Sequence, residues 1–277
     1  MIIDWKRIAL KIYDEISKEV KNLKNTPTLW AILVWDNPSS LRYIWQKRKW
    51  AEYVWINFEL KTLDKDISHE DLLKVIKDFN EDKNISSYII QLPLPEQINT
   101  EEIINSIDPK KDADWFTALN MWKISLWDES VMFPCTPSGI MKIIKEENID
   151  LIWKFVVVIW RSNIVWKPIT SMLLNSWATV INCNSKTKNI EDFTKKADIV
   201  IVATWNPGLL KLDMIGKDTM VIDVWFTVID WKIHWDTCFE DINNAWNKIT
   251  PVPGWVGPLT VAYLMKNTLK SHKLNNI

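Results

Sequence analysis

Helical and strand patterns alternate along this chain of 277 residues, and this alternation constrains its fold more than any other feature. Amphipathic segments with apolar residues three or four positions apart are separated by short apolar runs typical of buried strands. A second series begins with the β-branched run KFVVVI at residue 154, which is typical of a central parallel strand. Helices are predicted near 5–24, 39–53, 68–79, 166–175 and 258–270, and strands near 29–34, 55–61, 88–90, 154–159, 178–182, 198–203 and 219–224.

Strands that alternate with helices form a mostly parallel sheet with helical crossovers. We therefore expect an α/β protein of two domains, the second domain being Rossmann-like. We place the domains at residues 1–120 and 121–257, and we expect the final helix, within 258–277, to pack back on the first domain.

Composition excludes several classes of protein. The 34 Lys and Arg balance 35 Asp and Glu, so a general nucleic-acid-binding role is not expected. The 3 cysteines are far apart and the 3 His show no zinc spacing, so we expect neither a disulfide framework nor a bound metal, and a reducing cytoplasm. No run of about 18 apolar residues is present, so we expect neither export nor a membrane anchor.

Trp is abundant and Gly is scarce: the chain has 19 Trp and 5 Gly, whereas an average Gly content of about 7% would give roughly 19 Gly. Several Trp stand in turn-like contexts, where positive φ or close backbone approach usually requires Gly. We interpret most of them as UGA codons that the source organism reads as glycine. The alternative is a Trp-rich protein, whose Trp would fall on periodic core positions rather than in turns. The turn-like positions are Trp5, Trp35, Trp205, Trp231 and Trp235.

The second series has the order of a dinucleotide-binding unit: a strand, a tight turn at residues 160–166 and a helix. With Trp160 and Trp166 read as Gly, this turn has room for a phosphate, which Arg161 and Ser162 would help to bind. The next strand ends in Asn-Ser-Lys-Thr, so Ser185 and Lys186 stand where an NAD enzyme has an acidic residue. This favours NADP over NAD, because these groups suit a 2′-phosphate. An ordinary polar βα turn is the alternative.

Candidate catalytic groups lie in the first series. Tyr43 and Lys47 are four residues apart on one predicted helix and share a face. A lysine on a face that lines a cleft can exchange protons near neutrality when desolvation lowers its pKa. Gln91 ends a strand at the carboxyl edge, where ligands of open α/β sheets bind. The alternatives are a solvated Lys47 in a basic run and a solvated loop around Asp112 and Asp114.

Six segments carry a specific pattern: Tyr43-x-x-x-Lys47, Gln91-Leu92-Pro93-Leu94-Pro95, residues 111–116 (KDADWF), 134–137 (PCTP), 160–168 (WRSNIVWKP) and 251–260 (PVPGWVGPLT). In order and spacing they resemble the bifunctional methylenetetrahydrofolate dehydrogenase/methenyltetrahydrofolate cyclohydrolase family, over essentially the whole chain. Most Trp, including Trp115 and Trp255, fall where that family usually carries Gly; Trp30, Trp45, Trp50 and Trp246 are set apart from this group. Asn184 departs from the family, which often has His there.

The resemblance implies two steps in one cleft between a folate-binding first domain and an NADP-binding second domain. 5,10-Methylenetetrahydrofolate is oxidised with NADP, and the methenyl product is then hydrolysed to 10-formyltetrahydrofolate. Lys47 would transfer protons during hydrolysis, Gln91 would orient Lys47, and Tyr43 and Asp114 would contact the folate. The remaining implied site residues are Trp160, Arg161, Ser162, Trp166, Ser185 and Lys186 for the cofactor, and Pro253, Gly254 and Gly257 for the substrate.

The resemblance also implies a homodimer. Two other functions stay open from the sequence. One is a different NAD(P) oxidoreductase, including a dehydrogenase without cyclohydrolase activity, in which Lys47 and Gln91 would be incidental. The other is a non-catalytic nucleotide- or folate-binding protein, which gains support if the Trp are literal.

Overall fold

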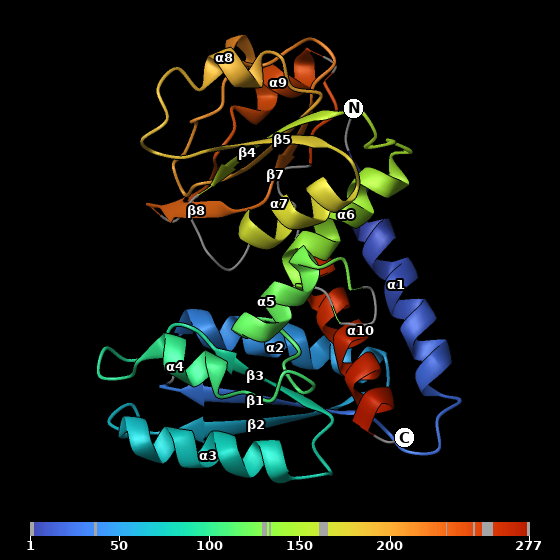
Figure 1. The fold of residues 1–277 in the computed structure, drawn as a ribbon, viewed down its shortest axis with the longest axis vertical. Helices are drawn as coiled ribbons and strands as arrows, with labels where there is room; N and C mark the ends of the chain where they lie inside the picture. The colour runs from blue at the N-terminus through green and yellow to red at the C-terminus, as the bar shows by residue number, and fades with distance from the viewer. Residues whose placement is uncertain are drawn as a thin grey trace. The chain divides into compact units, whose positions relative to one another are not determined.

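The computed structural model describes residues 3–35, 38–128, 132, 134–160, 166–230, 232–245, 247–250 and 257–275. The chain divides into two compact units (Figure 1). The first unit consists of Leu10–Cys135 with Val261–Ile277, and the second of Met1–Ala9 with Thr136–Thr260. The residues of α1 (Trp5–Val20) and α10 (Gly257–Asn275) are divided between the two.

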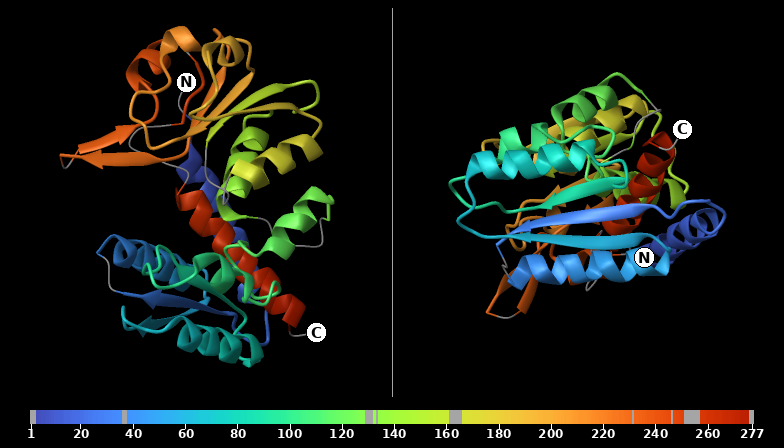
Figure 2. Two further views of the ribbon diagram at one scale, coloured as in Figure 1. Left: turned by 60° about the vertical axis from the view of Figure 1, so that its left-hand side comes forward. Right: turned by 90° about the horizontal axis from the view of Figure 1, so that it is seen from below.

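The first unit is built on a parallel sheet of order β2-β1-β3. Its strands are β1 (Thr28–Val34), β2 (Asn57–Leu63) and β3 (Ser87–Gln91). The crossovers α2 (Pro38–Tyr53) and α3 (His69–Glu81) lie on opposite faces of the sheet (Figures 1 and 2). Opposite faces follow from right-handed crossovers, because β2 and β3 pair with opposite edges of β1.

The core of the first unit follows from the apolar spacing of α3. Leu72 and Ile76, four residues apart on that helix, are fully buried with Ile32 of β1 and Ile103 of α4 (Thr100–Asn105). Ser68 caps the start of α3 by accepting a hydrogen bond from the Asp71 N–H at 3.1 Å. These contacts fix the position of β1 and β3, whose carboxyl ends carry the candidate site.

The second unit has a four-stranded parallel sheet of order β5-β4-β6-β7. In Figure 1, α8 (Glu191–Thr194) and α9 (Phe239–Asn244) lie above this sheet and α7 (Trp166–Asn175) below it. The β-branched residues of β4, β6 and β7, including Val157, Val200 and Val221, are fully buried. The strands are β4 (Phe155–Trp160), β5 (Thr179–Cys183), β6 (Ile199–Ala203) and β7 (Met220–Asp223).

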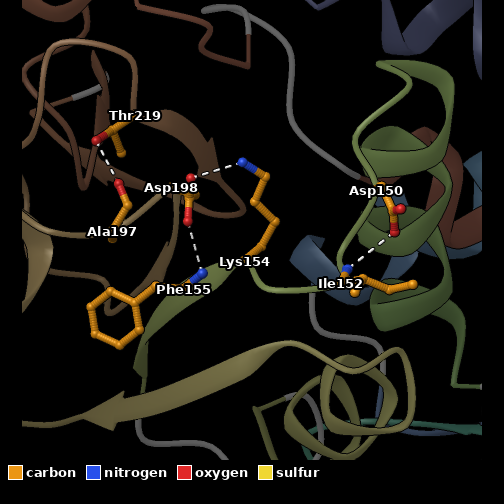
Figure 3. Close-up of polar contacts among 7 residues, drawn as sticks. All are labelled: Asp150, Ile152, Lys154, Phe155, Ala197, Asp198 and Thr219. Carbon is orange, nitrogen blue, oxygen red and sulfur yellow. Dashed lines mark hydrogen bonds and ion pairs between the residues drawn. The ribbon is translucent and has the colours of Figure 1, made fainter.

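Side chains fix where the strands of the second unit begin (Figure 3). The Asp198 carboxylate accepts from the Phe155 N–H at 2.8 Å and from Lys154 Nζ at 2.9 Å. The Thr219 hydroxyl donates to the Ala197 carbonyl at 2.8 Å. With their starts aligned, these parallel strands end at one common edge.

The two-unit α/β organisation predicted from the alternation is confirmed, and α7 has the predicted bounds. Helix α1 ends at Val20, earlier than predicted. Trp5 begins α1 and Trp235 ends β9, so our interpretation of these two positions as turns is wrong. The sequence analysis did not predict the antiparallel hairpin of β8 (Phe226–Ile229) and β9 (Lys232–Trp235), the helices α5 (Ala118–Ser125) and α6 (Cys135–Glu146), or the 3-10 turn η1 (Leu212–Met214).

Left-handed backbone occurs mainly at Trp. Among the described residues, ten other than glycine have positive φ, and seven of these are Trp. A Cβ makes this conformation unfavourable, whereas Gly adopts it freely, so these φ values support the interpretation of such Trp as glycine positions. Trp50, by contrast, lies inside α2 and stacks on Tyr13 with ring centroids 4.0 Å apart. The seven are Trp35, Trp55, Trp115, Trp127, Trp153, Trp177 and Trp205.

Candidate active site

Lys47 and Gln91 meet at the carboxyl end of the first sheet. Lys47 lies half-buried on α2, and its Nζ donates a hydrogen bond of 3.1 Å to Gln91 Oε1. Gln91 is the last residue of β3, and its Nε2 donates to the Leu92 carbonyl at 2.9 Å. That second bond fixes the amide so that its oxygen faces Lys47. The solvated alternative for Lys47 is therefore wrong.

The loop after β3 brings Asp114 to the same place. Burial raises the pKa of the Asp114 carboxyl, and the Lys47 ammonium partly offsets this rise. The side chain of Asp114 is partly buried. A carboxylate in this position can accept hydrogen bonds from paired N–H groups of a ligand.

Asp112 is a structural carboxylate rather than a solvated one. It is 1% exposed, and its oxygens accept from the N–H groups of Trp115 at 2.8 Å, Phe116 at 3.2 Å and Thr117 at 2.9 Å. Asn120 Nδ2 donates to it as well, at 3.0 Å. Burial raises the pKa of Asp112, and the donors from Thr117, Phe116 and Asn120 oppose that rise. The solvated-loop alternative is wrong for this residue.

Cys135 lies in this group of residues, and the sequence analysis gave it no role of its own. Burial raises the pKa of the Cys135 thiol well above its usual value, and the Asp114 carboxylate raises it further, whereas Lys47 lowers it. Its Sγ lies 3.4 Å from the Ala113 carbonyl. The motif at 134–137 was the available signal, but it carried only the family resemblance.

Tyr43 precedes Lys47 by one helical turn, as the spacing predicts. Its side chain is partly buried, and burial raises the pKa of its phenol, with a smaller opposing effect from Arg42. A phenol in its neutral form can donate a hydrogen bond as well as accept one.

The predicted cofactor residues that the structure describes lie at the carboxyl edge of the second sheet. Trp160 ends β4 and Trp166 begins α7, while Arg161 and Ser162 lie outside the described residues. Ser185 and Lys186 are exposed just beyond the end of β5, which is the neighbour of β4. Residues 184–188 hold no acidic side chain and two lysines. This edge suits a phosphorylated ribose.

The loop predicted to contact substrate is described only at its end. Gly257 is buried and begins α10. Pro253 and Gly254 lie outside the described residues.

Two buried carboxyl groups shape the edge of the second sheet. Asp236 accepts from the backbone N–H groups of Trp205 at 3.2 Å and Asn206 at 2.7 Å, which fixes the loop after β6. Asp223, fully buried at the end of β7, accepts from the N–H of Thr237 at 3.0 Å and from its hydroxyl at 2.8 Å. Burial raises the pKa of Asp223 to about 8; the bonds from Thr237 lower it and Asp236 raises it.

In the described part of the chain, no group of three or more His, Cys, Asp or Glu side chains is arranged to hold a metal ion. Over the same residues, no helix is both long and apolar enough to cross a membrane.

Fold and site together define a class: an α/β enzyme whose first unit presents a lysine, an amide and a carboxyl group and whose second unit binds a dinucleotide. Residues 3–114 match the profile of the tetrahydrofolate dehydrogenase/cyclohydrolase catalytic domain. Residues 134–276 match the NAD(P)-binding domain of the same proteins. The chain therefore belongs to the tetrahydrofolate dehydrogenase/cyclohydrolase family.

Relatives match over nearly the whole chain. The bifunctional protein FolD of Bacillus licheniformis is 43% identical, covering 98% of this chain and 97% of the relative. FolD of Bacillus subtilis is 42% identical with the same coverage. The crystal structure of the bifunctional enzyme FolD from Campylobacter jejuni superimposes with a TM-score of 0.96 at 39% identity, covering 99% of each chain. A structure of the Trypanosoma brucei enzyme, complexed with NADP cofactor and inhibitor, has a TM-score of 0.90 at 31% identity, covering 99% of this chain and 97% of that one.

Proposed function

We propose that this chain uses NADP to oxidise 5,10-methylenetetrahydrofolate and then hydrolyses the methenyl product to 10-formyltetrahydrofolate. The observation that carries the second activity is the hydrogen bond of 3.1 Å between Lys47 Nζ and Gln91 Oε1, beside Asp114. A dehydrogenase without cyclohydrolase activity would not need this pair. We assign folate binding to the first unit and NADP binding to the second.

Residues of the first unit have separate roles in hydrolysis and folate binding. Lys47 takes a proton from the water that attacks the methenyl carbon and returns it to the departing ring nitrogen. Gln91 accepts from one N–H of Lys47 and so directs the remaining donor and lone-pair positions of the amine toward the substrate. Asp114 accepts hydrogen bonds from the amino and ring N–H groups of the pterin. Tyr43 contacts the ring system from the same face of α2.

NADP, when bound, accepts the hydride from the one-carbon bridge of the substrate. In the second unit, Ser185 and Lys186 bind the 2′-phosphate, and Arg161 and Ser162 contribute from the turn after β4. The lysines and the lack of acidic side chains at residues 184–188 support a phosphorylated cofactor. With Gly at positions 160 and 166, the residues of this edge fit the cofactor.

We further propose that the protein acts in the cytoplasm as a homodimer and binds neither membranes nor nucleic acid. Its three cysteines are free thiols, which suits a reducing compartment. The near-zero net charge of -1 gives no general attraction to nucleic acid. Sedimentation analysis measures the assembly directly, and a monomer at micromolar concentration would exclude the dimer.

The test separates the two activities in one variant. We expect Lys47→Met to keep the fold and folate binding but to abolish hydrolysis of methenyltetrahydrofolate. Hydrolysis is measured as the decrease in the ultraviolet absorbance of methenyltetrahydrofolate. Lys49→Met is the matched control, because Lys49 lies on the same helix with its ammonium 5.9 Å from the Trp50 ring centroid. Cyclohydrolase turnover close to wild type in Lys47→Met would remove Lys47 from the mechanism.

A further inference from the structure

The buried face of α10 in the first unit carries polar side chains among apolar ones such as Leu264 and Met265. Asn267, Thr268 and Ser271 are each no more than 4% exposed. Instead of filling an apolar core, their side chains bond to β3 and to the loop that carries Asp114. Ser271 contacts the carbonyls of Ser86 and Lys110, and the Thr268 hydroxyl accepts from the Ser87 hydroxyl at 3.0 Å.

Asn267 reaches the peptide group directly before Asp114. Its Nδ2 donates to the Ala113 carbonyl at 2.9 Å and lies 3.6 Å from the Cys135 sulfur. The Cys135 thiol points at the same carbonyl from 3.4 Å. Because a peptide unit is planar, holding the Ala113 oxygen also fixes the plane that contains the Asp114 nitrogen.

The peptide group directly after Asp114 is fixed as well. Its N–H, that of Trp115, donates to Asp112 Oδ1 at 2.8 Å. Asp112 is itself anchored, because the N–H of Thr117 and the amide of Asn120 bind its other oxygen. Both peptide planes beside the Asp114 Cα are therefore held, so the direction of its side chain depends only on its own rotamer.

We propose that Asn267 is a positioning residue for folate recognition: with Cys135, and opposite Asp112, it holds the backbone that aims the Asp114 carboxylate at the pterin. This inference rests on the proposed function, because it deepens the role assigned to Asp114. A carboxylate that must meet two N–H donors at once tolerates little misplacement, and small shifts in a positioned group lower binding and rate.

The prediction is a selective loss of folate affinity. In the enzymatically active protein, Asn267→Leu keeps the side-chain shape but removes the donor. We expect the KM for methylenetetrahydrofolate to rise about tenfold, which is about 1.4 kcal/mol. The KM for NADP should stay unchanged, and kcat should change less than about twofold.

Thr268→Val is the matched control, because Thr268 is the next residue of α10, is fully buried and loses a comparable hydrogen bond to Ser87. We expect it to lower the melting temperature much as Asn267→Leu does, without raising the KM for folate. If Asn267→Leu does not fold, Asn267→Ala, which leaves room for water, is measured in its place. Equal folate KM values in the Asn267 and Thr268 variants would refute the positioning role.

A double-mutant cycle tests whether Asn267 acts through Asp114. In an Asp114→Asn background, adding Asn267→Leu should raise the folate KM less than about twofold, since the aimed carboxylate is already lost. If Asn267→Leu still raises the folate KM tenfold in the Asp114→Asn background, the inference is overturned while the proposed function stays intact. Wild-type protein inactive on methylenetetrahydrofolate would instead refute the proposed function.

Discussion

Replacing the seven left-handed Trp by Gly should stabilise the protein. Left-handed backbone costs a residue with a Cβ about 1–2 kcal/mol. Taking about 1 kcal/mol per site, after the greater chain entropy of Gly in the unfolded state, seven sites amount to about 7 kcal/mol. This approaches a typical total stability of about 5–15 kcal/mol.

Little stability is lost when these indoles are removed, because six of the seven are exposed by 44% or more. Trp115 is the exception. It is fully buried with φ of 66°, and its indole N–H has no hydrogen-bond partner. Burying an unpaired N–H costs about 1–3 kcal/mol. Glycine removes this penalty together with the strain, but the cavity left by the buried indole opposes the gain at this one site.

The assay compares urea denaturation, soluble yield and methylenetetrahydrofolate oxidation for the literal-Trp protein and the seven-Gly version. We expect the literal protein to be insoluble or unable to bind cofactor. A separate nine-Gly version, with Gly at Trp160 and Trp166 in addition to the seven sites, should be soluble and NADP-dependent. Trp50→Gly is the control: this residue lies inside α2, where Gly costs about 1 kcal/mol, so it should destabilise.

A folded, active literal-Trp protein as stable as the glycine version would refute the steric reasoning. The hypothesis of recoding has its own measurement: the mass of the protein purified from its native host, together with the codons at the 19 Trp positions. Trp at the seven left-handed positions of that native protein would refute the recoding.

Two further predictions concern the second unit. Arg161→Ala should weaken the binding of NADP more than the binding of NAD, because a charge-assisted contact to the 2′-phosphate contributes roughly 1.5–3 kcal/mol. A cofactor titration in which the wild-type protein prefers NAD would contradict this assignment. The raised pKa of Asp223, about 8, means that the unfolded chain releases this proton near pH 4 while the folded chain keeps it, so stability falls as pH rises between these values. Between pH 5 and 8, the free energy of unfolding measured by urea denaturation should therefore fall by about 1–3 kcal/mol less in Asp223→Asn than in wild type. Parallel pH profiles of the two proteins would exclude this group as the cause.

Local patterns were sufficient for most of the helices and strands and for part of the site. The spacing of Tyr43 and Lys47 follows from one helical turn, and Gln91 lies at a strand end because prolines follow it. The turn contexts of Trp35 and Trp205 likewise anticipated their left-handed φ. Such features depend on neighbours within a few residues, so the sequence by itself determines them.

Only the tertiary structure decided which distant groups meet. Asn267 lies 154 residues after Ala113, and nothing in its neighbourhood on α10 distinguishes it from other polar residues of that helix. Asp112 and Asp114 read alike in sequence, yet packing makes one a fully bonded structural carboxylate and leaves the other beside Lys47. Hydrogen bonds between elements depend on how helices and strands pack, and periodicity along the chain carries no information about that packing.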